Sequence, residues 1–109
     1  DNIRSIIREI KNVSENCEFI LVNSFPCNPL YERDATLFDG YLKKLNKIAA
    51  EDEGGHIVVA DMQKVGKYYM QTKKYCEISS SNVNHPNDFL HRVYAMNIVS
   101  TICDYKNIK

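Results

Sequence analysis

Two short apolar runs separated by a segment of helical spacing constrain the fold more than any other feature of the chain. Phe19-Ile20-Leu21-Val22 has the composition of a strand that is buried on both faces of a sheet, and His56-Ile57-Val58-Val59-Ala60-Asp61 is a second, β-branched apolar run. Between them, apolar residues recur at helical spacing from about Asp34, and Gly54-Gly55 is predicted to close this helix as a C-terminal cap. The order strand, helix, strand predicts a right-handed βαβ unit with two parallel strands.

Further helices are predicted on both sides of this unit. Residues 2 to about 14 carry isoleucines at helical spacing, and residues 62 to about 70 favour a short helix. A last helix is predicted from Pro86, in its first turn, to about Cys103. The segment between the last two helices, Gln71 to Asn84, is polar and rich in serine, so we predict that it is irregular.

The number of strands is small for the predicted architecture. Two parallel strands make a poor sheet, because parallel sheets normally have several strands with helices on both faces. The fold class is therefore α/β, and we expect residues 1–109 to be the C-terminal portion of one three-layer α/β/α, doubly wound (flavodoxin-like) domain. In that case the strand at residues 19–22 exposes an unpaired edge, and we expect self-association through it.

Composition excludes several kinds of partner. Fourteen Lys and Arg balance fourteen Asp and Glu, so the formal net charge of zero gives no reason to expect nucleic-acid binding. The apolar runs are far shorter than the roughly 20 residues of a membrane span, so no membrane insertion is predicted. The four cysteines have no C-x-x-C spacing, and we expect them to be buried free thiols. We expect neither a metal nor a cofactor.

The candidate site follows from the predicted topology. Ligands of doubly wound sheets bind outside the carboxyl ends of the strands, which places Asn23 to Tyr31, Asp61 to Gln63 and the approach to the last helix at the site. His85 lies in the third of these segments, just before a helix. A histidine in this position is well placed to act as a general base on a serine at the end of another strand.

The residues around His85 resemble a known family. Asn82-Val83-Asn84-His85-Pro86-Asn87-Asp88 and the seven residues after it are similar to the last sequence block of the SGNH/GDSL hydrolases, in which Asp-x-x-His-Pro-Asn opens the terminal helix. The resemblance implies a serine esterase of about five parallel strands, with His85 as the proton-transferring residue. It further implies a small ester or an acetylated carbohydrate as substrate.

The chain departs from the family pattern in two respects. The blocks that would carry the serine, and the glycine and asparagine of the oxyanion hole, have no counterpart here, so the isolated chain is expected to be inactive. Asn82 replaces the usual aspartate, and an amide can orient an imidazole but cannot stabilise the imidazolium by charge. Either another carboxylate or a backbone carbonyl replaces that aspartate, or the enzyme works as a Ser-His dyad.

The predicted site therefore combines a catalytic pair with a pocket wall. His85 and Asn82 are the predicted catalytic residues, and the predicted substrate-binding residues are Asn23, Ser24, Pro26 and Asn28. Other candidates have simpler explanations: His91 as a solvated histidine, Asp61 as a residue that binds nearby backbone amides, and Cys27 as a thiol without a helix N-terminus to activate it. A non-catalytic α/β binding or assembly module remains the alternative.

Overall fold

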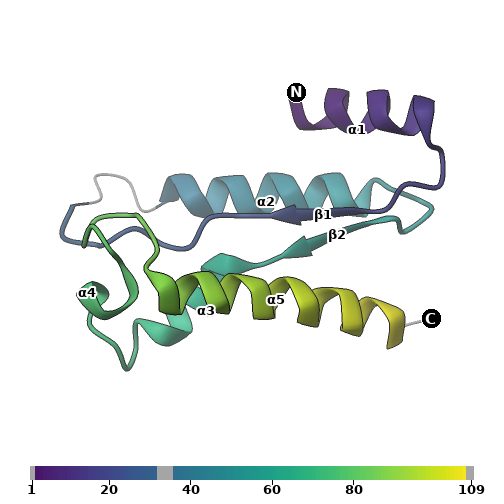
Figure 1. The fold of residues 1–109 in the computed structure, drawn as a ribbon. Helices are drawn as coiled ribbons and strands as arrows, with labels where there is room; N and C mark the ends of the chain where they lie inside the picture. Colours follow the sequence, from purple (N-terminus) through teal and green to yellow (C-terminus); the bar gives the residue numbers. More distant parts are fainter. Residues whose placement is uncertain (1, 32–35, 108–109) are drawn as a thin grey trace.

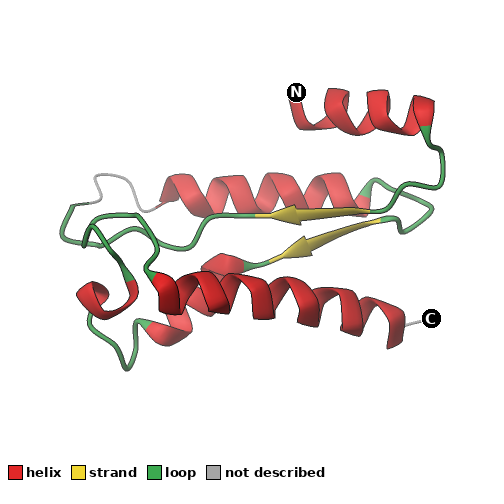
Figure 2. Cartoon of the chain, viewed as in Figure 1, coloured by secondary structure: helices red, strands yellow, loops and turns green. Residues whose placement is uncertain are grey.

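A computed structural model describes residues 2–31 and 36–107 as a mixed α/β chain with a two-stranded sheet. Figures 1 and 2 show the two strands side by side with helices around them. The elements are, in chain order, α1 (Asn2–Val13), β1 (Phe19–Val22), α2 (Thr36–Ala50), β2 (Ile57–Ala60), α3 (Met62–Tyr69), α4 (Tyr75–Ile78) and α5 (Asp88–Asn107).

The two strands are parallel, as the βαβ prediction requires. Phe19 lies opposite Ile57 and Val22 lies opposite Ala60. Helices α2 and α5 both pack against β2, and Figure 1 shows them on opposite sides of the strands. The carboxyl ends of both strands consequently meet at one end of the molecule, where α3 and the start of α5 also lie.

Two apolar clusters hold the elements together, one on each side of the sheet. Ile7, Ile48 and Ile57 form the first cluster, with Phe19, Leu21 and Ala49 packed against it, so α1 and α2 share one face. The second cluster joins the loop after β1 to α3 and α5 and consists of Phe25, Met62, Leu90 and Val93. Because each cluster draws on elements far apart in sequence, the fold depends on long-range packing.

Helix α1 is fastened to the end of α2 by polar contacts as well as by Ile7. Arg4 Nη2 lies 2.8 Å from a carboxylate oxygen of Glu51, and Lys11 forms an ion pair with Asp52. The Lys11 hydrogen bond is the main cause that holds the pKa of Asp52 below its ordinary value, and the backbone N–H of His56 adds to it, while burial acts in the opposite direction. Ile6 and Val13, however, remain exposed.

The strand at residues 19–22 is not buried on both faces, contrary to the prediction. Phe19 and Leu21 are half-buried in the first cluster, whereas Ile20 and Val22 are 36% and 41% exposed. The reason is the position of α5, which packs against β2 and leaves the corresponding face of β1 open.

Helix boundaries also differ from the predictions. Helix α2 ends at Ala50, before Gly54-Gly55, and Gly55, with a φ of 65°, lies instead in the turn that leads into β2; the predicted start at Asp34 lies outside the described residues. Pro86 precedes α5 rather than lying in its first turn, because it forms a bridge with Ser79. The segment predicted to be irregular contains the single-turn helix α4.

The cysteines are less buried than predicted. The structure joins none of the four in a disulfide, but Cys76 and Cys103 are exposed, and Cys17 and Cys27 are half-buried. Sequence position alone could not separate the exposed pair from the half-buried pair, because the exposure of each thiol depends on tertiary packing. None of the helices in the described ranges combines the length and the apolar character that crossing a membrane requires.

Candidate functional site at the carboxyl ends of the strands

The loop after β1 is anchored to three different helices. The phenol oxygen of Tyr94, on α5, accepts a hydrogen bond from the backbone N–H of Phe25 at 2.9 Å, and Tyr75, on α4, donates its hydroxyl to the carbonyl of Pro26 at 3.0 Å. Helix α3 contributes Gln63, whose side chain is buried and donates to the carbonyl of Ser24 at 3.0 Å. Burial raises the pKa of Tyr94, partly offset by the Phe25 N–H.

Helix α3 also approaches this loop very closely. A Cβ atom at Gly66 would lie 2.3 Å from Cδ of Pro26, so only glycine fits at that point of the helix. Met62 begins α3, and its backbone N–H donates to the side-chain oxygen of Asn23 at 2.6 Å. The end of β1 and the start of the helix after β2 are thus joined directly.

His85 lies in a tight turn whose backbone is held by three consecutive serines. The carbonyl of His85 accepts hydrogen bonds from the hydroxyl of Ser79 at 2.7 Å and the N–H of Ser80 at 2.9 Å. The hydroxyl oxygen of Ser81 accepts the N–H groups of Val83, Asn84 and His85 at 3.2 to 3.3 Å. The main chain of His85 is therefore fixed on both sides of its Cα atom, while its side chain is exposed.

Asn87 connects this turn to α5. Its side-chain oxygen accepts the N–H of Leu90 at 3.1 Å, the contact of an N-cap residue, and its amide donates to the carbonyl of Glu77 at 2.7 Å. Asp88 follows as the first residue of α5, where a carboxylate interacts favourably with the helix dipole. The imidazole of His85 consequently precedes the N-terminus of a long helix.

A single buried side chain joins the two loops of the site. Asn28 is only 3% exposed and donates its amide to the carbonyl of Asn82 at 2.7 Å, with Oδ1 of Asn82 at 3.4 Å. The backbone N–H of Asn28 donates to the carbonyl of Val83 at 2.9 Å. Asn82 has a φ of 57°, a left-handed conformation that asparagine tolerates better than most residues.

The predicted site residues differ in burial and in the contacts they make. Asn28 and Asn82 are brought into direct contact, but among the described residues no hydrogen bond joins Asn82 to the His85 ring. Asn23 and Pro26 are buried, and Ser24 is exposed next to them. The predicted substrate-binding residues thus lie on the loop after β1, and Asn82 lies on the turn that carries His85. Their roles toward a substrate remain predictions.

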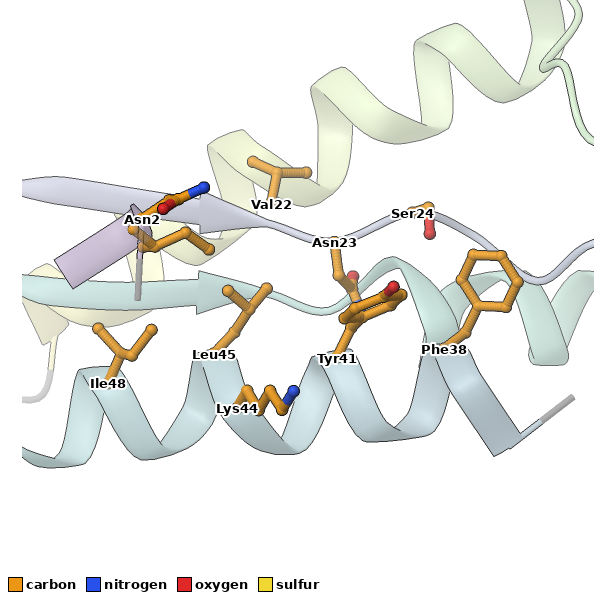
Figure 3. Close-up of a pocket in the computed structure, with 10 residues that line it drawn as sticks. Asn2, Val22, Asn23, Ser24, Phe38, Tyr41, Lys44, Leu45 and Ile48 are labelled. Atoms are coloured by element: carbon orange, nitrogen blue, oxygen red, sulfur yellow. The ribbon is translucent and has the colours of Figure 1, made fainter. Parts of the chain in front are cut away.

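Two hollows border the loop after β1. One, of about 300 Å³, lies between the loop, the start of α2 and α3, and Lys67 and Asp39 form an ion pair of 2.8 Å beside it. The other, of about 620 Å³, extends between the start of α1, the end of β1 and α2 (Figure 3). Within the described ranges, no group of three or more His, Cys, Asp or Glu residues is arranged to hold a metal ion.

Several structural residues of the site were not found from the sequence. Ser81, Tyr75 and Tyr94 hold the loops through polar contacts that have no periodic signal in the sequence. Asn87 could have been found, because an asparagine directly before Asp88-Phe89-Leu90 is a typical helix N-cap pattern. Asp61 fulfils its simpler explanation, since its carboxylate caps α3 by accepting the N–H of Lys64 at 3.0 Å.

In comparisons with known proteins, no protein-family model, no curated protein and no solved structure matches the chain.

Proposed function

We propose that this chain supplies the catalytic histidine, His85, of a serine ester hydrolase whose nucleophile lies outside the 109 residues. The two strands would then belong to a larger three-layer, doubly wound sheet. The substrate would be a small ester or an acetylated carbohydrate. The observation that supports the proposal best is the fixed backbone of an exposed histidine, directly before α5 and joined to the loop at the carboxyl end of β1.

The proposed role of His85 is proton transfer. Its imidazole would remove the proton from the serine hydroxyl as the oxygen attacks the ester carbonyl, and the imidazolium would return that proton to the leaving alcohol. Water would then release the acyl group in a second cycle of the same transfer. A general base must have a defined position, and the three serine contacts to the His85 backbone support that requirement.

Asn82 has a positioning role in this proposal. Its side-chain oxygen is directed to Asn28 in the described structure, so it supports the turn rather than the imidazole ring. A Ser-His dyad, or a triad completed by a carboxylate outside this chain, therefore suits the geometry better than a triad built on Asn82. Ser24, the exposed member of the predicted pocket wall, is the residue we propose to contact substrate directly, while Asn23, Pro26 and Asn28 shape the wall.

The alternative is a non-catalytic binding or assembly module. The observation that favours it is that the backbone contacts of His85 with Ser79 and Ser81 stabilise the turn without the imidazole ring. The residues around His85 would then serve the structure of the turn alone. The two functions make opposite predictions for the imidazole, because a purely structural turn does not need the ring.

The test is hydrolysis of p-nitrophenyl acetate by the longer hydrolase that we propose contains this chain. His85→Ala should lower the rate at least about a hundredfold, the usual contribution of a general base, and added imidazole should restore part of it. His91→Ala is the matched control, since His91 is exposed on α5 six residues further along and should leave the rate unchanged. Equal rates in wild type and His85→Ala would favour the binding module.

A further inference from the structure

Two hollows meet along helix α3, on the side that α2 faces. The first is the hollow of about 300 Å³ beside the loop after β1, and the second, of about 510 Å³, extends along α3 from Asp61 to Gln71. Gln63 and Lys67 line both hollows, so the two form one groove. The residues that α3 and the turn after it contribute to this groove recur at helical spacing and share one side of the helix: Gln63, Lys64, Lys67, Tyr68, Met70 and Gln71.

Gln63 contributes a hydrogen-bond acceptor to the groove. The residue is only 3% exposed, and its Nε2 donates to the carbonyl of Ser24, but its Oε1 has no hydrogen-bond partner among the described residues. This oxygen is not sealed in the core, because the fully enclosed side-chain polar atom without a partner in the described part of the chain is Nδ2 of Asn23. An amide that is fixed through its nitrogen therefore offers its oxygen to a ligand in the groove.

Tyr68 contributes an exposed aromatic ring. Its side chain lines the second hollow and is 64% exposed. The ring is held edge-to-face by Tyr69, with 5.5 Å between the ring centroids, and Tyr69 packs in the same way on Phe89 at 5.3 Å. A ring that is exposed but oriented by its neighbours has an apolar face ready for stacking, with the hydroxyl as a polar tip. This arrangement suits a ligand that has an apolar face and polar edges.

The charges of the groove favour a neutral ligand. Among the described residues that line it, the ammonium groups of Lys64 and Lys67 are balanced by the carboxylates of Asp39 and Asp61. Lys67 and Asp39 form the ion pair of 2.8 Å, and Asp61 accepts the backbone N–H of Lys64. A nucleic-acid backbone would find no net positive charge here, whereas these polar groups can exchange hydrogen bonds with hydroxyl groups.

We propose that this groove binds an oligosaccharide of neutral sugars. A pyranose ring has an apolar face of C–H groups and hydroxyl groups at its edge, which are the two features that Tyr68 and the polar groups of the groove complement. One sugar stacks on Tyr68, and a hydroxyl of the chain donates to Oε1 of Gln63. Because the groove follows the whole length of α3, it suits a chain of sugars better than a single small molecule.

The groove remains open in the larger sheet that we propose. Strands added beside β1 would extend the sheet sideways, whereas α3 follows the carboxyl end of β2 and the groove lies between α3 and α2 (Figure 1). This end of a doubly wound sheet is where ligands bind. For the proposed hydrolase, the inference selects an acetylated carbohydrate over a small ester as substrate, and in this respect it rests on the proposed function.

The test is titration of the ¹⁵N-labelled chain with xylotetraose, cellotetraose and chitotetraose to millimolar concentration, followed by NMR of the backbone amides. At least one of these tetrasaccharides should shift the amide signals of α3, and Tyr68→Ala should raise its dissociation constant at least about tenfold through the lost ring contact. Tyr41→Ala is the matched control, since Tyr41 is 50% exposed on α2, lines neither hollow of the groove and should leave binding unchanged.

A second variant tests the far end of the groove. Gln71→Ala should weaken binding about fivefold, the usual contribution of one hydrogen bond, whereas Asn46→Ala, at an exposed position of α2 outside the groove, should not. Circular dichroism reports whether each variant is folded.

Three results would overturn the inference: no shift with any of the tetrasaccharides, binding that is indifferent to Tyr68→Ala, or shifts of the same signals by a uridine tetranucleotide and not by sugars. Binding to the groove requires neither the imidazole of His85 nor the nucleophile, so His85→Ala should bind the sugar as the wild type does. Loss of sugar binding and loss of hydrolysis are therefore separate results, and either proposal can fail alone.

Discussion

The amide of Asn28 donates a hydrogen bond of 2.7 Å to the backbone oxygen of Asn82, and this contact ties the loop after β1 to the turn that carries His85. Because the side-chain oxygen of Asn28 also accepts the N–H of Leu30 at 3.1 Å, one buried residue organises both loops. The position of the histidine relative to the strand end therefore depends on this asparagine.

Asn28→Ala should destabilise the protein by about 2 kcal/mol, since it removes two part-buried hydrogen bonds, to the carbonyl of Asn82 and from the N–H of Leu30, at about 1 kcal/mol each. Urea denaturation monitored by circular dichroism measures the loss. Asn46→Ala is the matched control, because Asn46 is exposed on α2 and alanine suits a helix. Equal midpoints for the two variants would contradict the role of Asn28.

The left-handed conformation of Asn82 gives a second prediction. Asn82→Ala should lower the free energy of unfolding by about 1 kcal/mol, because a Cβ atom disfavours a φ of 57°, whereas Asn82→Gly should cost less. Thermal unfolding of the two variants side by side checks the order. If alanine proved as stable as glycine, the turn would not require a positive φ.

The contact between α3 and the loop after β1 predicts opposite effects for two glycines. Gly66→Ala should be destabilising, because its methyl group would lie 2.3 Å from Cδ of Pro26 and one of the two segments must move. Gly40→Ala, in α2, meets no atom within 4 Å and should stabilise by up to about 1 kcal/mol through helix propensity. Denaturation midpoints that shift in the same direction would argue against the close contact.

The ion pair between Lys11 and Asp52 predicts a pH dependence of stability. The pKa of Asp52 is lowered by the hydrogen bond from Lys11, so its contribution is present above the ordinary aspartate pKa and is lost as the pH falls through the lower pKa of the folded state. The difference in melting temperature between wild type and Asp52→Asn should therefore shrink as the pH is lowered from about 5 to about 2.

The control for that comparison is Glu53→Gln, at the exposed neighbouring position. Its difference from wild type should change less over the same pH range, since no described ion pair involves Glu53. A wild-type advantage over Asp52→Asn that persists at the acid end would mean that Lys11 does not act through the charge of Asp52.

The two strands and the helices around them were predictable because their signals are local. A continuous apolar run bounded by polar residues, or isoleucines at helical spacing, indicates a strand or a helix without knowledge of the partner, and Phe19–Val22, Ile57–Ala60 and α1 were confirmed at or within a residue of their predicted bounds. Burial did not follow from these patterns, since Ile7 is the buried isoleucine of α1 and Ile20 and Val22 are exposed. Helix ends were less predictable: α2 stops before Gly54-Gly55 because the turn at Asp52 receives the N–H groups of Gly55 and His56.

For the site, too, local features were predictable and long-range contacts were not. The sequence by itself determined that two parallel strands bring the loop at Asn23–Asn28 to one end of the sheet, and that His85 precedes a helix, because alternation, spacing and turn residues act between neighbours in the chain. Only the tertiary structure decided that Asn28 meets Asn82, 54 positions away, that Asn23 accepts the N–H of Met62, 39 positions away, and that one face of β1 stays open. Such contacts arise from packing between distant segments, which no local pattern encodes.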